Sequence, residues 1–435
     1  MNRLLFLTSC LILALAAPVL GAENPLEDGR LSAVEAYQWA LDRNPQLQGV
    51  RLQEDRMAAS RRGALGWEAP EVSYMREGMA SDLPAPGEER WTITQELPSL
   101  LSGMKRRSGY GAYLEAARLE EQDARRRLRS RVKVLYVEVV HRQKVVDLLA
   151  DQITLSRQAH QAVTLKEELG EASKRERLQS QLNNAALKQD LLVAQAEFDQ
   201  ARYALFEVMG LTPDEQEYGV EFTDPLVFND VDYTQDESLG ELGVQPRYLA
   251  AAAQRHAAES LLAAEQWTLF PDLSVSLYQQ NYEGEGFDHH GFEVAARLPL
   301  WFMPARQGRL GEAKAEAALG RWRQEAVLLE MKREIEQAWH GYETSLSIIR
   351  QLTGESLDQS TELLNLTLEG YREGEVGLLD LIAAQQTYTA SQRRYQDALF
   401  DYYQRLITLE TYLPGELIMA VETAAPESEN QGAGK

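Results

Sequence analysis

The sequence predicts a mainly α-helical chain with some β-structure, in which long coiled-coil helices and short amphipathic strands are duplicated in tandem. Three observations predict this fold class: an internal repeat, two very long stretches without proline, and four short segments of alternating apolar and polar residues. Sliding the 435-residue chain by 201 positions aligns Pro70 with Pro271 and Leu97-Pro98 with Leu298-Pro299. Sliding it by 204 positions aligns Gly170-Glu171 with Gly374-Glu375. Self-similarity at a nearly constant offset over a whole half indicates a tandem duplication.

Each half is expected to contain a helix, a β-hairpin, a very long helix, a turn and a shorter helix. The first repeat spans 23–211, with its hairpin at 70–98, its long helix at 103–169 and its second helix at 171–209. The second repeat spans 244–413, with its hairpin at 271–299, its long helix at 305–371 and its second helix at 375–413. An acidic connection, 212–243, joins the repeats, and the polar tail 414–435 is expected to be disordered.

Capping signals and residue spacing predict the helices. Ser32, with Glu35 three residues later, has the capping-box spacing, and the helix that it opens is expected to run to about Trp67. The proline-free stretch 103–169 can form one helix about 100 Å long. Spacings of alternately three and four residues indicate coiled-coil packing in the run Leu381, Ala384, Tyr388, Ser391, Tyr395, Ala398, Tyr402, Leu406, Leu409 and Leu413.

Composition and the N-terminus suggest an exported protein. A formal charge of -23 argues against nucleic-acid binding, which needs a clustered basic excess. Residues 1–22 have the charge, apolar run and small residues of a signal peptide; an uncleaved anchor and a lipoprotein site at Cys10 are the alternatives. Cleavage would remove the single cysteine, so disulfides and cysteine-based metal sites are not expected. The remaining chain has no apolar run of about 18 residues, so any membrane crossing is expected to use strands.

The predicted strands have one apolar and one polar face. Trp91, Ile93 and Leu97 alternate with Thr92, Thr94 and Glu96, and the segments 272–280 and 292–298 alternate in the same way. Two interpretations of these strands are possible: small sheets packed on helices in a soluble protein, or transmembrane β-barrel strands. Four strands cannot close a barrel, because about eight is the smallest closed number. The transmembrane interpretation therefore requires several chains to share one barrel.

Enzyme chemistry is not indicated. The chain lacks GxSxG, HExxH and phosphate-binding GxxxxGK[ST] motifs, so neither a catalytic site nor a cofactor is expected. His289-His290 beside Asp288 is the only dense group of metal-ligand residues, and a polar hairpin tip is the preferred interpretation. The connection 212–243 carries ten acidic residues, but without the glycine spacing of a calcium loop. No metal site is predicted.

Several segments together resemble the TolC-like outer membrane efflux proteins. They are the opening LSAVEAYQWALDRNPQL at 31–47, the duplicated hairpins, the turn YREGEVGLLDLIAAQ at 371–385, and its degenerate copy LGEASKRERLQSQ at 169–181. The resemblance covers essentially the whole chain after the signal peptide, through the combination of repeat, lengths and turns. Gly103-Met-Lys-Arg-Arg after the first hairpin is similar to the heavy-metal, CzcC-like branch.

The resemblance implies a homotrimer whose twelve strands, four per chain, form one outer-membrane β-barrel that continues as a helical tunnel into the periplasm. It implies a periplasmic adaptor and an inner-membrane pump, expected to be of the RND type, as partners. The channel would be a passive exit for small toxic solutes, with metal cations among the candidates. Outer-membrane lipid would contact seven strand residues: Val72, Trp91, Ile93, Leu273, Val275, Phe292 and Val294. Five would face the lumen: Thr92, Thr94, Glu96, Glu293 and Arg297.

The turns at the far end of the long helices are expected to contact the adaptor. Gly170 and Gly374 are predicted to reverse the chain, because glycine reaches backbone conformations that other residues avoid. The adjoining residues Glu171, Glu375 and Gly377 complete the predicted tips.

In the family, aspartates six and nine residues after the second tip glycine line the periplasmic constriction. Those positions are Asp380 and Ala383 here, so only one carboxylate ring is expected. Three copies of Asp380 around one axis would repel each other and favour cation binding. A solvated carboxylate at a helix start is the alternative.

Two rival functions remain at this stage. Within the channel class, the chain could be the exit duct of type I protein secretion. Outside it, a periplasmic coiled-coil scaffold without a pore would explain the long heptads but not the duplicated alternating hairpins.

Overall fold

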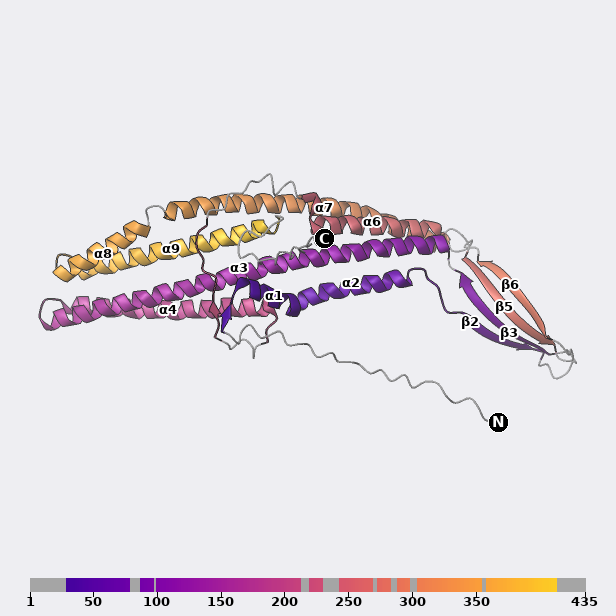
Figure 1. Ribbon diagram of the computed structural model, residues 1–435, viewed down its shortest axis with the longest axis horizontal. Helices are drawn as coiled ribbons and strands as arrows, with labels where there is room; N and C mark the ends of the chain where they lie inside the picture. Colours follow the sequence, from indigo (N-terminus) through magenta and orange to yellow (C-terminus); the bar gives the residue numbers. More distant parts are fainter. Residues whose placement is uncertain are drawn as a thin grey trace, which may run out of the picture.

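The protein is an elongated molecule, with its strands at one end and, at the other, the two turns that connect its long helices to the shorter ones (Figure 1). The computed structural model describes residues 29–78, 87–97, 99–212, 219–229, 242–268, 272–282, 288–297, 303–353 and 357–412. The predicted signal peptide, the tail 414–435 and most of the acidic connection lie outside these ranges. None of the described helices combines the length and the apolar character needed to cross a membrane.

The elements repeat in the order helix, two strands, long helix, shorter helix. The first half comprises β1 (Arg30–Leu31), α1 (Ala33–Arg43), α2 (Pro45–Gly63), β2 (Glu71–Glu77), β3 (Glu88–Leu97), α3 (Leu100–Glu168), α4 (Lys174–Met209) and β4 (Glu221–Phe222). The second half comprises η2 (Leu242–Val244), α6 (Pro246–Trp267), β5 (Asp272–Tyr282), β6 (His289–Arg297), α7 (Met303–Gln351), α8 (Leu357–Glu373) and α9 (Leu378–Glu410).

The expected single helix from Ser32 to Trp67 is wrong, because one helix ends and another begins at Asn44. The Asn44 side chain accepts a hydrogen bond from the Leu47 amide at 3.0 Å and donates one to the Val208 carbonyl at 2.8 Å. Pro45 occupies the first turn of α2, where its missing N–H costs nothing. Asn44 is therefore the N-cap of a new helix and also ties that helix to α4. Upstream, Ser32 and Glu35 form the predicted capping box at the start of α1.

The second expected long helix, 305–371, is also wrong as one element, because it is divided into α7 and α8. At the end of α7 the Thr353 hydroxyl donates to the carbonyls of Ile349 and Arg350, at 2.9 and 3.2 Å. Threonine hydroxyls that bond the preceding turn compete with the helical ladder. By contrast α3 continues for 69 residues, and its Gly109 serves packing: a Cβ there would lie 2.9 Å from the Leu261 side chain of α6.

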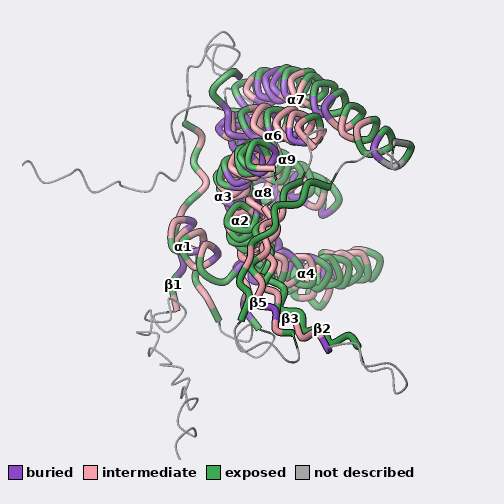
Figure 2. Tube along the Cα trace, turned by 90° about the vertical axis from the view of Figure 1, so that its right-hand side faces the viewer, coloured by how far each residue is buried: buried purple, intermediate pink, exposed green. Residues whose placement is uncertain are grey.

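One antiparallel sheet of order β2-β3-β5-β6 combines the hairpins of both repeats. Its central pair, β3 and β5, aligns Ile93 with Leu277 and Thr94 with Ser276, whose hydroxyls lie 2.9 Å apart. Seen from the strand end, the sheet consists mostly of exposed and half-buried residues (Figure 2). The sheet therefore has no covering layer within the described chain.

The main core lies midway along the helices, where both repeats meet the segment 219–229. The buried Tyr136 of α3 donates to the Leu31 carbonyl at 2.8 Å and accepts from the Asp224 amide at 3.1 Å. Burial raises the pKa of this phenol far above its ordinary value. On the other side, the Tyr402 and Tyr403 hydroxyls of α9 each donate to a carbonyl of the same segment at 2.7 Å. These bonds satisfy the backbone of an irregular segment and fix it across the two repeats.

Gly210→Ala is expected to lower the free energy of unfolding by more than about 2 kcal/mol. Gly210 ends α4 with φ +76°, and a Cβ there would lie 2.6 Å from the Arg43 carbonyl oxygen, so strain and steric overlap add. Gly170 is the matched control: its φ is +78°, but a Cβ would meet nothing within 4 Å. Gly170→Ala is expected to cost only about 1 kcal/mol. Thermal unfolding of both variants tests this, and equal losses would contradict the steric argument.

Candidate functional site

The sheet presents an exposed apolar face. The register aligns Val72 with Ile93, Ile93 with Leu277, and Leu277 with Phe292, so these side chains share one face. The same face holds the remaining residues of the predicted lipid contact: Trp91, Leu273, Val275 and Val294. Phe292 is 73% exposed, and of the seven only Val275 is half-buried. A contiguous exposed apolar patch of this kind marks a contact with lipid or protein.

The register adds two residues that the predicted lipid contact left out. Tyr74 pairs with Trp91, their ring centroids 4.8 Å apart, and Leu277 is 60% exposed in the centre of the apolar face. Alternation in the segment 272–280 already pointed to Leu277. Alternation from Val72 in the same way already pointed to Tyr74, which follows it by two residues.

The opposite face of the sheet is polar. It carries all five residues of the predicted lumen lining, and across it Arg297 Nη2 lies 2.8 Å from Glu96 Oε1. Gly291 lets the Tyr278 ring lie against the backbone of β6, since a Cβ would come within 2.3 Å of that ring. His289 lies on this polar face and His290 on the apolar one, because adjacent strand residues alternate. The two imidazoles therefore do not converge with Asp288 on one metal position.

The two tip turns lie together at the end opposite the sheet (Figure 1). Both predicted glycines adopt positive φ, +78° at Gly170 and +83° at Gly374, as the expected chain reversal requires. The turns have the same hydrogen bonds: the Glu171 amide donates to the Lys166 carbonyl at 2.8 Å, and the Glu375 amide to the Gly370 carbonyl at 2.8 Å. This pattern satisfies carbonyls left over at the helix ends. The side chains of Glu171 and Glu375 are exposed.

Asp380 occupies the same helix position as Glu176 in the first repeat. The Ser173 amide and hydroxyl both donate to Glu176, at 2.6 and 2.9 Å, and these bonds hold the pKa of that carboxyl below its ordinary value. Asp380 accepts one bond, from the Gly377 amide at 3.2 Å, because glycine supplies no hydroxyl. Its side chain is exposed at the first turn of α9. It therefore caps the helix and keeps its carboxylate accessible from solvent.

The two tips are attached to each other. Lys166 Nζ lies 3.3 Å from the Tyr371 carbonyl oxygen and 4.6 Å from the centre of the Tyr371 ring. Below this contact, Val163 packs with Leu378 and Leu381 in a small buried cluster. Sequence reasoning missed this contact, because its partners are 205 residues apart. These contacts hold the two turns against each other.

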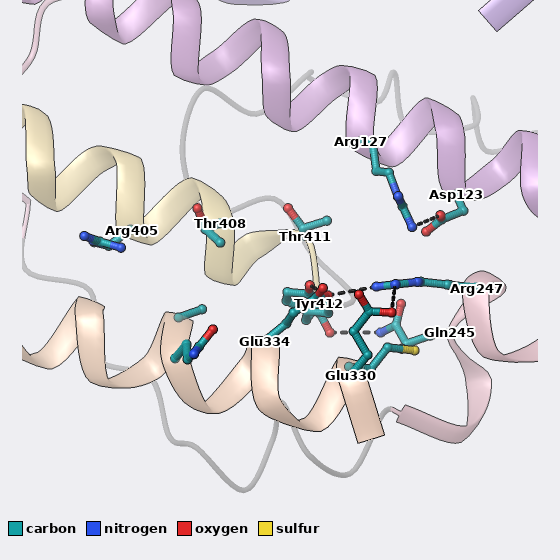
Figure 3. Close-up of a pocket in the computed structure, with 13 residues that line it drawn as sticks. Asp123, Arg127, Gln245, Arg247, Glu330, Glu334, Arg405, Thr408, Thr411 and Tyr412 are labelled. Carbon is teal, nitrogen blue, oxygen red and sulfur yellow. Dashed lines mark hydrogen bonds and ion pairs between the residues drawn. The ribbon is translucent and has the colours of Figure 1, made fainter. Parts of the chain in front are cut away.

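A groove of about 500 Å³ lies between α3, α6, α7 and α9 at mid-length (Figure 3). Arg247 donates to Glu330 and Glu334 at 2.5 and 2.8 Å, and Tyr412 donates to Glu334 at 2.6 Å. Burial, followed by the neighbouring Glu334 carboxylate, raises the pKa of the Tyr412 phenol. The arginine and the two glutamates therefore pair with one another, and these bonds hold helices of the second repeat together in the groove. Over the described ranges, no group of three or more His, Cys, Asp or Glu could hold a metal ion.

Comparisons with known proteins agree with this architecture. Residues 242–415 match the family described as "Outer membrane efflux protein". The cobalt-zinc-cadmium resistance protein CzcC of Cupriavidus metallidurans is 22% identical over 286 residues, which cover 66% of this chain and 67% of CzcC.

Two solved structures have the same fold. The outer membrane protein VceC of Vibrio cholerae superposes with a TM-score of 0.75 at 16% identity, covering 87% of this chain and 95% of VceC. The outer-membrane channel OprN superposes with a TM-score of 0.74 at 16% identity, covering 89% of this chain and 90% of OprN. The family match covers the second repeat of the duplicated fold, and both solved structures that share this fold are outer-membrane proteins.

Proposed function

We propose that three copies of this chain form the exit duct of a tripartite efflux pump, a passive channel that catalyses no reaction. The observation that carries the proposal is the sheet, which has one exposed apolar face, one polar face and two outer strands, β2 and β6, unpaired within the described chain. An unpaired edge strand can form hydrogen bonds with a strand of another chain. A sheet that spans a membrane must close into a barrel, because lipid offers no hydrogen bonds to the N–H and C=O groups of an open edge. Three copies of the described sheet supply twelve strands, whereas one copy supplies four.

The polar face of the sheet suits a water-filled lumen and the apolar face suits lipid. Transmembrane barrels alternate in this way, with apolar residues outward and polar residues inward. In this arrangement, the seven residues of the predicted lipid contact meet the bilayer, together with Tyr74 and Leu277. The long helices of α3 and α7 then continue from the barrel as the wall of the tunnel.

The tips are the proposed contact with a periplasmic adaptor, which would link the channel to an inner-membrane pump of the RND type. Gly170, Glu171, Gly374, Glu375 and Gly377 lie in the two turns at the end farthest from the sheet, with both glutamates exposed. Their paired hydrogen bonds and the Lys166–Tyr371 contact give the tips a defined shape for docking.

Small toxic solutes, with metal cations as the favoured class, are the proposed cargo. The similarity to CzcC, named for resistance to cobalt, zinc and cadmium, supports this choice. So does the charge of the proposed lumen face: it carries six acids (Glu71, Glu77, Glu88, Glu96, Asp272 and Glu293) and two arginines (Arg90 and Arg297), a net charge of 2 − 6 = −4 per chain. An acidic wall concentrates cations.

Asp380→Asn is expected to weaken blockade of the channel by multivalent cations by about tenfold, because three carboxylates at a constriction act together. Conductance of the purified channel in planar bilayers, with and without the blocking cation, measures this. Glu176→Gln is the matched control, since it removes a carboxylate from the same helix position of the first repeat. Unchanged blockade in Asp380→Asn would remove Asp380 from the constriction.

The native mass of the protein extracted from outer membranes in detergent tests the proposed function. The full chain has a mass of 49.1 kDa, so a particle of about three chains is expected after correction for bound detergent. A monomer released without detergent would contradict the shared barrel. Deletion of the gene is expected to cause sensitivity to metals or drugs, whereas loss of a secreted protein instead would assign the duct to type I secretion.

A further inference from the structure

A cluster of five cations lies at the junction between the sheet and the helices. Arg61 and Arg62 are in the last turn of α2, which leads into β2, and Lys105, Arg106 and Arg107 follow the start of α3, which leaves β3. Four of them are exposed, and Arg106 is half-buried. Such clustering is unexpected in a chain with a net charge of -23.

Close packing brings the two groups together. A Cβ at Gly103 would lie 3.1 Å from the Leu65 carbonyl oxygen, so the start of α3 touches the end of α2. The Arg61 side chain of α2 lies beside Gly111 of α3, with Nε 3.5 Å from where a Cβ on that glycine would be. In the same way, the Arg106 side chain lies 3.4 Å from where a Cβ on Gly66 would be. Glycine at position 103 permits the close approach of the two helices, so two basic segments about 40 residues apart in sequence share one surface.

Ion pairing within the chain does not explain the cluster. None of the five cations has an ion pair or a side-chain hydrogen bond with another described residue, and Arg106 Nε is buried without an acceptor. Two cations farther along the same helices are paired: Arg118 lies 2.7 Å from Glu54, and Arg51 lies 3.2 Å from Glu121. Glu68 and Glu71, which follow Arg62 in the sequence, form no ion pair with the cluster.

The helix dipole explains only part of the cluster. Arg61 and Arg62 lie in the last turn of α2, where positive charge is favoured. Lys105, Arg106 and Arg107 lie beyond the first turn at the N-terminal end of α3, which offers them no such stabilisation. The two groups lie on neighbouring parts of α2 and α3, which pack against each other at Gly103. Like charges on one surface repel, so an anion from outside the described chain would stabilise the arrangement.

The second repeat provides an internal comparison. At the start of α7, Arg306 is buried and donates to the Thr268 hydroxyl at 3.3 Å, and Arg309 lies 3.6 Å from Glu265 of α6. The corresponding end of α2 carries Arg61 and Arg62 instead of an acid. Arg306 Nε, like Arg106 Nε, is buried without an acceptor, so the two repeats differ in the acid that pairs with Arg309 and in the larger number of cations at the first junction.

Exposed apolar side chains accompany the cations. Trp67 and Leu100 are each 64% exposed, Met104 is 57% exposed and Leu101 is 49% exposed. They adjoin the strands that carry the apolar face of the sheet. Tryptophan and long cationic side chains beside an apolar surface are typical of the boundary between lipid tails and headgroups.

We propose that this junction patch, formed by Arg61, Arg62, Lys105, Arg106 and Arg107 with Trp67, Leu100, Leu101 and Met104, binds anionic phospholipid headgroups of the periplasmic leaflet. The inference rests on the proposed function, which puts the sheet in the bilayer and the helices in the periplasm. Phosphate groups supply the missing acceptors for the guanidinium groups, and the apolar side chains contact the acyl chains beneath. The partner is a lipid surface of negative charge.

The test compares the thermal midpoint of the purified trimer in nanodiscs of phosphatidylcholine with that in nanodiscs that also contain phosphatidylglycerol. The wild type is expected to unfold about 3 °C higher with phosphatidylglycerol, and high salt is expected to reduce the difference. The variant R61Q/R62Q/K105Q/R107Q is expected to lose the difference. Native mass spectrometry of the trimer should show fewer retained phosphatidylglycerol molecules in this variant.

The matched control is R131Q/R157Q/K188Q/K332Q, which removes four exposed cations spread along the helices. None of these four has an ion pair or a side-chain hydrogen bond with a described residue. This control is expected to keep the wild-type response to phosphatidylglycerol. An identical midpoint of the wild type in both lipids, or an equal loss in both variants, would overturn the proposal.

A further outcome separates this inference from the proposed function. If the junction variant is monomeric in neutral detergent while the control is trimeric, the patch contacts another copy of the chain and the lipid proposal fails. In that case, the proposed channel stands. Failure of the wild type itself to form a detergent-extractable trimer would instead remove the proposed function.

Discussion

Phe292→Arg is expected to eliminate most of the trimer that detergent extracts from the outer membrane. Phe292 lies within β6, is 73% exposed and belongs to the apolar face with Ile93 and Leu277. An arginine on the lipid face of a barrel costs about 2–4 kcal/mol near the bilayer midplane, and a trimer contains three copies. The amount of trimer in the outer-membrane fraction, measured by immunoblot, gives the effect.

Ala295→Arg is the control for this prediction. Ala295 is in the same strand and is exposed, but it pairs with Ser274 on the polar face. The same added charge is therefore expected to face water and to leave the trimer nearly at the wild-type level. Equal losses from Phe292→Arg and Ala295→Arg would mean that the two faces of the sheet meet the same environment.

Lys133→Met is expected to lower the free energy of unfolding by about 3–5 kcal/mol, because it leaves a buried carboxylate without its cation. Lys133 of α3 and Glu410 of α9 are 3% and 4% exposed, and Nζ lies 2.6 Å from Glu410 Oε1. The other oxygen, Glu410 Oε2, has no hydrogen-bond partner within the described residues. This pair joins the two repeats in the middle of the molecule.

The double variant Lys133→Met/Glu410→Leu is expected to recover most of the lost stability, since it buries no charge. Arg30→Met provides a control for an exposed pair: Arg30 lies 3.4 Å from Glu221, with both side chains about two-thirds exposed, and its loss is expected to cost less than about 1 kcal/mol. Chemical or thermal unfolding of the four proteins measures these differences. A double variant as unstable as Lys133→Met would mean that the uncompensated carboxylate is not the cause of the loss.

Several features were visible in the sequence because they depend on neighbours along the chain. The helix reversals at Gly170 and Gly374 follow from local backbone freedom, and the two faces of the strands follow from residue alternation. The break at Asn44-Pro45 had a local signal as well, a capping residue before proline. It was overlooked because the helical pattern continues on both sides. The division of the second long helix near Thr353 had a weaker signal.

The sequence by itself determined the duplication, the amphipathic strands, the long helices and the glycine turns, because each is encoded in spacing within one segment. Only the tertiary structure decided which side chains meet across the two repeats. The buried ion pair joins residues 277 positions apart, and the Lys166–Tyr371 contact joins residues 205 apart. The junction patch arises in the same way, since only the contact of Gly103 with Leu65 brings its two basic segments together. Such contacts depend on packing between helices, and helical spacing alone does not specify the partner of a given face.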